Sequence, residues 1–329
     1  MDGSPPSHFY EAFHNISSIV KVLSVCCYCV AFIVGSVGNG LVIWIAGFRM
    51  KTVSAVWFAN LAIIDFLFCV SLPLSIMEWL WLDVGELFFY TPIIHWIRLQ
   101  LNSNVSIIFI TVISIDRWVS VMWPFWSRVH RTRKLAIVVS LVIWTVPQII
   151  GVVWTFTLNS STVPLSYTHV QRDFFSIFND TYFDIVNVSF VHTLSPHFHH
   201  HPSFFTFTLC LTIIPLCNCM IVLKLQNRAF KRPKTLQKTL RVTIAVVVCF
   251  FICWIPYYIW PVIEYNRNSS TEFLTNFTVN VICVWLATIS SCINPVIYVL
   301  VGQKHKPNNK RSIKAKLEET MENAMNEPK

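Results

Sequence analysis

Seven long runs of apolar residues follow one another along the chain, and each is long enough to cross a bilayer as a helix. They cover residues 19–47, 53–81, 92–122, 133–156, 203–226, 237–263 and 274–301. A transmembrane helix needs roughly 20 predominantly apolar residues. The runs leave no room for a separate soluble domain and show no internal repeat. The pattern therefore predicts an all-α membrane protein that folds as one bundle of seven transmembrane helices.

Basic residues are concentrated on one side of this predicted bundle. Of the 25 lysines and arginines, 20 lie in or beside the loops after the first, third and fifth runs and in the segment after the seventh. The positive-inside rule places that side in the cytosol. We therefore expect an extracellular N-terminus over residues 1–18, a seven-helix region over 19–301 and a cytosolic tail over 302–329. Since this topology explains the net charge of +9, a nucleic-acid partner is not expected.

Acceptor motifs for N-glycosylation support the same orientation, because all but one fall on the predicted outer side. The exception, at Asn104, lies inside the third run, where a glycan cannot be transferred, and we treat it as a false match. The predicted glycosylation sites are Asn15, Asn159, Asn179, Asn187, Asn268 and Asn276.

Several apolar runs carry charged or helix-breaking residues that are costly at membrane depth. They are Asp65 in the second run, Asp116-Arg117-Trp118 at the end of the third, Trp254-x-Pro256 in the sixth and Asn294-Pro295-Val296-Ile297-Tyr298 at the end of the seventh. Such residues persist within spans mainly where protein surrounds them and where they serve a function. They are the candidate functional residues of the chain.

In order and spacing these residues resemble the rhodopsin-like family of G-protein-coupled receptors, over about residues 20–305. The matching positions are Asn39, Asp65, Asp116-Arg117, Trp144, Pro215, Trp254-x-Pro256 and Asn294-Pro295-x-x-Tyr298. The resemblance implies a multi-pass plasma-membrane receptor that binds an extracellular ligand and activates a heterotrimeric G protein. Segments 59–68 and 123–132 look like those of chemoattractant receptors, namely the formyl-peptide, complement-anaphylatoxin, chemerin and prostaglandin D2 receptors. This subgroup implies the inhibitory G-protein class and chemotactic or inflammatory signalling.

The resemblance also assigns roles to the candidate residues. Asp116 and Arg117 are neighbouring opposite charges that can pair and hold Arg117 inward until a G protein binds; the alternative is an ion pair of little consequence. Trp254, beside the hinge at Pro256, can sense ligand, or it can be ordinary aromatic packing. The implied G-protein switch is Asp116, Arg117, Asn294, Pro295 and Tyr298, and the implied activation hinge is Pro215, Phe250, Trp254 and Pro256.

A sodium site is implied around Asp65. Oxygen ligands around a buried carboxylate suit a small hard cation, which in this family acts allosterically. The alternative is an Asp65 that is hydrogen-bonded to protein and water with no ion. The implied sodium ligands are Asp65, Asn102, Ser106, Ser291 and Asn294. No other cofactor and no structural metal are expected.

The outer half of the bundle should hold the ligand. Arg98 can receive a carboxylate from a peptide or a lipid acid, or it can be paired with Glu78 or Glu86. Leu99 stands where amine receptors carry an aspartate, so amine ligands are disfavoured. Acidic residues outnumber basic ones on the outer side, which favours a basic peptide or protein. The candidate ligand-binding residues are Glu78, His95, Arg98, Leu99, Asn102, Trp260, Glu264 and Trp285.

Several positions depart from the family pattern. The disulfide that the family makes between the third run and the second outer loop is absent, since residues 157–202 contain no cysteine, and no disulfide is predicted. Leu223 replaces the tyrosine that usually partners Tyr298. The tail has no cysteine for palmitoylation, and its only phospho-acceptors are Ser312 and Thr320, so arrestin binding through the tail should be weak. The His197–His201 run is more often incidental than metal-binding.

Other classes of membrane protein fit less well. A retinal protein needs a lysine in the seventh run, and none lies between Arg267 and Lys304. A transporter would show internal repeats, a channel would show polar stripes along a pore, and no motif supports an enzyme. The remaining alternative shares the fold: a decoy receptor that binds ligand without signalling. Apart from ligand and G protein, the expected surroundings are membrane lipid.

Overall fold

The computed structural model describes residues 7–80, 91–162, 202–226, 234–264 and 272–302, all of them helical apart from short connections. Seven of these helices or helix pairs are long and apolar enough to cross a membrane, as the sequence predicts. The helices are α1 (Ser7–Trp44) with a π-helical turn η1 (Ile45–Arg49), α2 (Val53–Val70), α3 (Leu72–Leu80), α4 (Thr91–Met122), α5 (Pro124–His130), α6 (Arg133–Thr162), α9 (Pro202–Gln226), α10 (Lys234–Glu264) and α11 (Glu272–Gly302).

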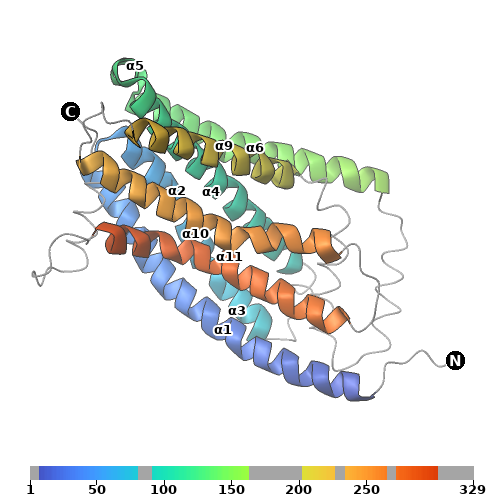
Figure 1. Ribbon diagram of the computed structural model, residues 1–329. Helices are drawn as coiled ribbons and strands as arrows, with labels where there is room; N and C mark the ends of the chain where they lie inside the picture. The colour runs from blue at the N-terminus through green and yellow to red at the C-terminus, as the bar shows by residue number, and fades with distance from the viewer. Residues whose placement is uncertain (1–6, 81–90, 163–201, 227–233, 265–271, 303–329) are drawn as a thin grey trace, which may run out of the picture.

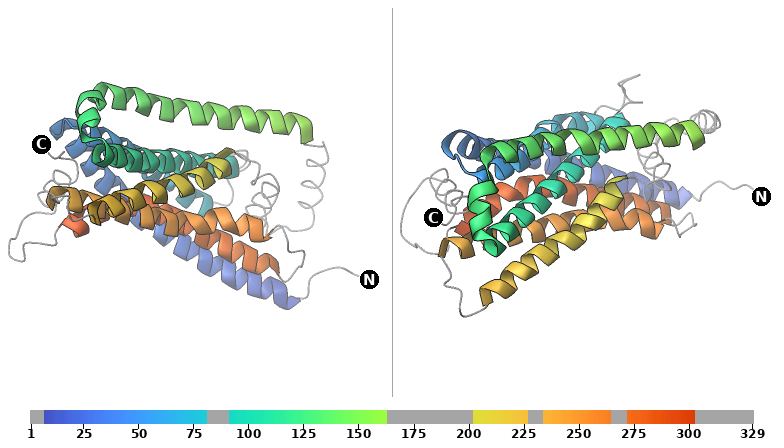
Figure 2. Two further views of the ribbon diagram at one scale, coloured as in Figure 1. Left: turned by 45° about the horizontal axis from the view of Figure 1, so that its top comes forward. Right: turned by 90° about the horizontal axis from the view of Figure 1, so that it is seen from above.

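The helices run side by side as one elongated bundle. Helices α1, α11 and α10 form one side, α6 lies at the opposite edge, and α4 passes between them (Figure 1). The start of α1 and the end of α11 lie at opposite ends of the bundle, and α5 crosses the end at which α11 finishes (Figure 2). This arrangement is the topology expected for an odd number of membrane crossings.

The second span consists of two helices rather than one. Helix α2 ends at Val70, and the backbone N–H of Ser71 donates to the carbonyls of Leu67 at 3.2 Å and Phe68 at 3.1 Å. Helix α3 begins at Leu72. Pro73 lies in the first turn of α3, where the missing N–H of a proline costs no helical hydrogen bond.

Helix α6 is the most lipid-facing of the long helices. A stripe of its apolar side chains points away from the bundle: Leu135, Val138, Leu141, Ile149 and Val152 are each 51–60% exposed. Such a stripe is far more apolar than a monomeric protein surface in water. In a bilayer the hydrocarbon chains of the lipids cover it.

Two glycines let α1 approach its neighbours closely. A Cβ added to Gly35 would collide with Sγ of Cys69 on α2 and would lie 3.1 Å from Sγ of Cys292 on α11. A Cβ added to Gly38 would lie 3.0 Å from the ring of Pro295. Small residues at helix contacts are a common device in membrane bundles, because they let backbones pack together. Here they bring α1 against the helix that carries the Asn294–Tyr298 motif.

Candidate functional site

A buried polar cluster surrounds Asp65 in the middle of the bundle. Asp65 is 2% exposed. Its two carboxylate oxygens accept hydrogen bonds from Nδ2 of Asn102 at 3.3 Å and from Nδ2 of Asn294 at 2.8 Å. Ser291 donates to Oδ1 of Asn102 at 3.3 Å. Three helices, α2, α4 and α11, are thus joined through one carboxylate.

Four of the five residues predicted to hold sodium, Asp65, Asn102, Ser291 and Asn294, are joined in this cluster, and the fifth, Ser106, lies about one turn of α4 from Asn102. Ser106 is 2% exposed, and its hydroxyl has no hydrogen-bond partner among the described residues. The oxygens of Asp65, Ser106, Ser291 and Asn102 are hard donors of the kind that alkali and alkaline-earth cations prefer. These residues therefore fit a sodium ion. The same contacts also suit an Asp65 carboxylate that is hydrogen-bonded to its neighbours without an ion.

Tyr298 lies beside the polar cluster and packs inward. Its ring meets that of Phe58 edge to face, with centroids 5.5 Å apart, and the residue is 2% exposed. Its hydroxyl is buried without a hydrogen-bond partner in the described part of the chain. Leu223, which stands in the place of the family's partner tyrosine, is 60% exposed and offers no hydroxyl. The departure noted in the sequence thus leaves Tyr298 packed against α2.

Trp254 is fully buried at the centre of an aromatic cluster. Its indole Nε1 donates to Oγ of Ser290 on α11 at 2.8 Å. Its ring stacks on Phe250, one turn away, with centroids 5.9 Å apart, and meets Tyr257 edge to face. Pro256 lies inside the same helix. The predicted hinge residues Phe250, Trp254 and Pro256 therefore lie together, with Trp254 hydrogen-bonded to a second helix.

The charged site at the cytosolic end contains a partner that the sequence analysis missed. Both oxygens of Asp116 accept hydrogen bonds of 2.6 Å from Arg131, one from Nε and one from Nη2. Arg131 also donates to Oγ of Ser54 on α2 at 2.8 Å. The prediction paired Asp116 with Arg117, whereas this ion pair ties α4 to α2 and to the segment after α5. The sequence signal for this contact was the position of Arg131, which directly follows a short helix with a proline at its N-terminus.

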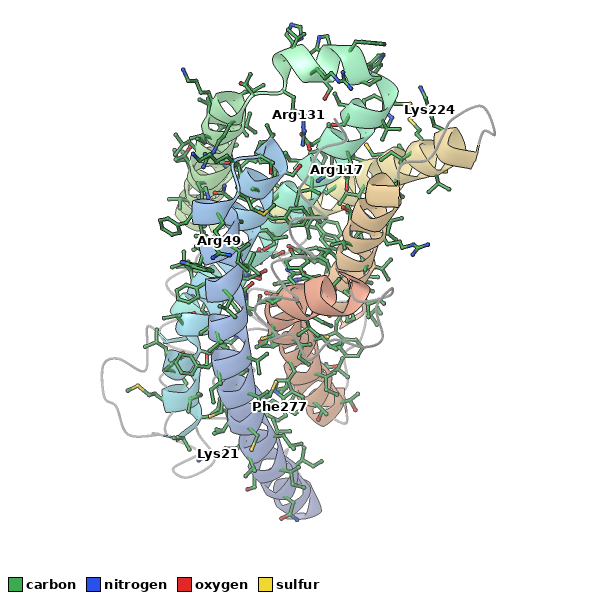
Figure 3. All side chains as sticks on the ribbon, turned by 90° about the vertical axis from the view of Figure 1, so that its left-hand side faces the viewer. Lys21, Arg49, Arg117, Arg131, Lys224 and Phe277 are labelled. Atoms are coloured by element: carbon green, nitrogen blue, oxygen red, sulfur yellow. The ribbon has the colours of Figure 1, made fainter. Side chains whose placement is uncertain are left out.

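Arg117 itself is 3% exposed, and its role as a switch stays a prediction. Figure 3 shows Arg117 and Arg131 close together at the end of the bundle where Arg49 also lies, with Lys21 and Phe277 toward the opposite end. Beside this buried charge, helix α5 exposes large apolar side chains: Phe125 is 83% exposed and Val129 is 71% exposed. The cytosolic end thus combines a hidden arginine with an exposed apolar helix.

The predicted ligand residues do not all face one cavity. Arg98 turns toward α2 and α3, where Nη1 donates to the carbonyl of Ser71 at 3.0 Å and Nη2 lies 2.9 Å from Nδ1 of His95. His95 Nδ1 is in turn 3.9 Å from a carboxylate oxygen of Glu78. The predicted ion pair of Arg98 with Glu78 is absent from the described residues, since His95 stands between them, and Glu86 lies outside the described part.

Asn102 belongs to the polar cluster around Asp65 and is 1% exposed, and its place among the ligand-binding residues stays a prediction. Leu99 is 2% exposed. Trp285 is held by a hydrogen bond of 3.0 Å from its Nε1 to Oγ of Ser24 on α1, and Trp260 has a buried Nε1 with no partner among the described residues. The side chain of Glu264 lies outside the described part.

The glycosylation motifs differ in accessibility. Asn15 is exposed on α1, whereas Asn276 is 6% exposed within α11, which counts against a glycan there. Asn159 lies in α6 with its side chain undescribed, and Asn179, Asn187 and Asn268 lie outside the described residues, as do the His197–His201 run and the tail.

A second polar set, absent from the sequence analysis, joins α4 to α9 and α10 in the outer half of the bundle. Ser103 and the hydroxyl of Tyr258 are hydrogen-bonded, and Nδ2 of Asn104 donates to Oγ of Ser203 at 2.7 Å. The ring of Tyr258 stacks on Phe207 with centroids 4.0 Å apart. The sequence signal was present, since α4 carries Gln100, Ser103 and Asn104 within five residues, but polar residues at these positions are unremarkable by type alone.

Comparison with known proteins finds similarity to one family of membrane receptors. The family described as "7 transmembrane receptor (rhodopsin family)" matches residues 38–298. Chemerin-like receptor 1 of Bos taurus is 32% identical over 310 residues, which cover 88% of this chain and 79% of that protein. The C3a anaphylatoxin chemotactic receptor of Danio rerio is 31% identical over 298 residues, covering 88% and 75%. Chemerin-like receptor 2 of Homo sapiens is 28% identical over 319 residues, covering 92% and 82%.

Proposed function

Because the chain belongs to the rhodopsin family of seven-transmembrane receptors, we propose that its extracellular ligand is a chemoattractant peptide or protein and that it activates the inhibitory class of G protein. Family membership makes it a multi-pass plasma-membrane receptor and not an enzyme. The proposal adds the ligand type, the G-protein class and a role in chemotactic or inflammatory signalling.

The observation that carries the signalling proposal is the arrangement at the cytosolic end. Arg117 is 3% exposed, while Phe125 on the neighbouring α5 is 83% exposed. A large aromatic side chain projecting from a helix at that end provides an apolar anchor for a partner, since aromatic residues dominate protein interfaces. Movement of α10 away from α4 would then uncover Arg117 beside this anchor, and both groups could bind the same G protein.

Trp254 provides a way for a ligand in the outer half of the bundle to cause movement at the cytosolic end. A ligand that displaces the indole must break the 2.8 Å hydrogen bond to Ser290 and the stacking on Phe250. Because Pro256 leaves α10 without one backbone hydrogen bond, the helix can bend at this level with a smaller loss of backbone hydrogen bonding. The proposed change is therefore a bend of α10 driven from Trp254.

The ligand proposal is supported by the relatives, whose names refer to chemerin and to C3a. Arg98 is already engaged by Ser71 and His95, which weakens the case for an acidic lipid as the ligand. Allosteric sodium at Asp65 and arrestin binding belong to this proposal as well, arrestin with a minor role for the tail.

A decoy receptor is the second candidate, and one observation favours it. The hydroxyl of Tyr298 has no hydrogen-bond partner within the described residues, and Leu223 cannot supply one. If an active arrangement needs that hydroxyl to be bonded to α9, this chain would bind ligand without holding an active state.

The test is ligand-dependent G-protein activation in cells that express the full chain. The ligands are chemerin and C3a, with their carboxy-terminal peptides, formyl peptides and prostaglandin D2. We expect a response to a peptide or protein ligand that pertussis toxin blocks. Arg117→Ala should abolish it, and Phe125→Ala, which changes an exposed side chain and spares the buried core, should weaken it at unchanged surface expression and ligand binding.

Three results would count against the proposal. Binding without activation would favour the decoy receptor. Activation that resists the toxin would exclude the inhibitory class. A response to prostaglandin D2 alone would exclude a peptide or protein ligand.

A further inference from the structure

Gln100 is a buried carboxamide without a hydrogen-bond partner in the part of the chain that the structure describes. The residue is 5% exposed, and neither its Oε1 nor its Nε2 has a hydrogen-bond partner among the described residues. Buried amide groups are nearly always hydrogen-bonded, because leaving them unsatisfied costs free energy. The buried carboxamide of Gln100 has two N–H donors and an acceptor oxygen, and we therefore expect it to bind a hydrogen-bonding partner.

The direction of Gln100 follows from the geometry of α4. With about 100° per residue, Ser103 lies roughly 60° to one side of Gln100 around the helix and Asn104 roughly 40° to the other. Ser103 contacts Tyr258 on α10, and Asn104 contacts Ser203 on α9. Gln100 therefore lies one turn further out and faces the seam between α9 and α10.

Arg98 points the other way. It lies roughly 160° from Gln100 around α4, and its guanidinium is engaged by groups of the second span, Ser71 and Ser75. The positive charge of this region is thus directed away from the seam. Among the described side chains, the polar groups of α4 on the seam side, Gln100, Ser103 and Asn104, are uncharged, and the aromatic rings of Tyr258 and Phe207 lie beside them.

Asn104 adds a second unused group on the same side. Its Nδ2 is bonded to Ser203, while its Oδ1 is buried without a partner in the described part. Gln100 and Asn104, one turn apart on one helix face, thus offer a free donor and two free acceptors among the described residues, arranged along α4.

We infer that Gln100 and Asn104 form a ligand-reading pair for an uncharged hydrogen-bonding group, of which a peptide amide is the type, in the seam between α4, α9 and α10. The inference rests on the proposed function, since it assigns the ligand chemistry of the same receptor. A peptide amide carries one donor and one acceptor in a fixed plane, and a carboxamide side chain satisfies both at once. A carboxylate would lack the donor that Oε1 requires.

The test uses purified full-length receptor in detergent and three forms: wild type, Gln100→Leu and Gln148→Leu. Gln148, on α6, also has a buried Nε2 without a described partner, so its replacement is a chemically matched control. The probes are the carboxy-terminal peptides of chemerin and C3a, each as free acid and as amide. The readouts are the unfolding midpoint without peptide and the affinity of each peptide.

We expect Gln100→Leu to unfold at the same temperature as wild type or a higher one, because it removes an unsatisfied group from the unliganded receptor. The same variant should bind peptide about tenfold more weakly, which corresponds to the loss of a buried hydrogen-bonded pair. Gln148→Leu should leave affinity unchanged. Amidation should preserve or improve binding to wild type.

Four results would overturn the inference. A lowered unfolding midpoint of Gln100→Leu would show that the carboxamide is bonded in the unliganded protein, for example to water. Unchanged affinity would remove Gln100 from the site. A tenfold loss on amidation would favour recognition of an acid. Failure of every peptide, in both forms, to bind wild type would exclude peptides as the ligand class. Binding through Gln100 without G-protein activation would refute only the signalling proposal.

Discussion

Removing Arg131 should destabilise the receptor strongly, even though the residue lies near the cytosolic surface. Its guanidinium holds Asp116 by two hydrogen bonds of 2.6 Å, and the two side chains are only 8% and 9% exposed. Breaking a buried ion pair by deleting one partner typically costs roughly 3–5 kcal/mol, since a buried charge is left alone. Because the pair lies at the edge of the bundle, where water can partly solvate Asp116, we expect a loss of about 3 kcal/mol for Arg131→Gln.

A double-mutant cycle separates the pair from the rest of the site. The unfolding free energy would be measured for wild type, Arg131→Gln, Asp116→Asn and the double variant. The double variant should be little worse than either single one, which gives a coupling energy of about 2 kcal/mol. Arg128→Gln, on the exposed face of the same short helix, is the matched control and should change stability by less than about 0.5 kcal/mol.

We also expect a functional effect, because the ion pair of Asp116 and Arg131 ties α4 to α2 and to the segment after α5. Arg131→Gln should raise G-protein activation in the absence of ligand. A coupling energy below about 0.5 kcal/mol, within the range of exposed ion pairs, would show that burial does not strengthen the 2.6 Å contacts between Arg131 and Asp116.

Three further predictions concern packing, the ion site and glycosylation. Gly35→Ala should destabilise the protein by roughly 1–3 kcal/mol through overpacking, measured by unfolding, and Cys69→Ala in the same chain should restore part of the loss because the colliding atom is Sγ of Cys69. Replacing potassium with sodium at constant ionic strength should raise the unfolding midpoint of wild type and leave that of Asp65→Asn unchanged; equal shifts in both would exclude a site at Asp65. Asn15→Gln should remove one glycan step on a gel, whereas Asn276→Gln should remove none, and a lost step for the second variant would show that Asn276 is accessible before the helix packs.

The helices could be predicted from the sequence because apolar runs of this length have one stable form in a bilayer. The break in the second span at Ser71 was not predicted, because prolines inside α6, α9, α10 and α11 leave those helices unbroken and Pro73 alone could not mark it. Helix α5 was missed because seven residues give too short a pattern, and only Pro124 at its first turn marks it. Local signals thus identified the long elements and left the short ones open.

Side-chain partners were harder to predict, since they depend on how helices rotate against one another. Asp65 and its neighbours in the cluster came from family resemblance, and the structure brings them together. Arg131 was missed because it lies 15 residues from Asp116 and reaches it only when the chain turns back after α5. Asn102 was placed in two sites because its type suits both, and only the rotation of α4 decides between them.

The aromatic cluster around Trp254 and the polar cluster around Asp65 are linked by adjacent residues of α11. Ser290 accepts the hydrogen bond of Trp254, and Ser291 donates to Asn102, which in turn donates to Asp65. Neighbouring residues on a helix point about 100° apart, so one turn of α11 faces both α10 and the polar cluster. A shift of Trp254 that pulls on Ser290 must therefore move Ser291 with it. For this reason the ligand signal and the occupancy of the Asp65 cluster should be thermodynamically coupled, each biasing the same movement of α11 against α4.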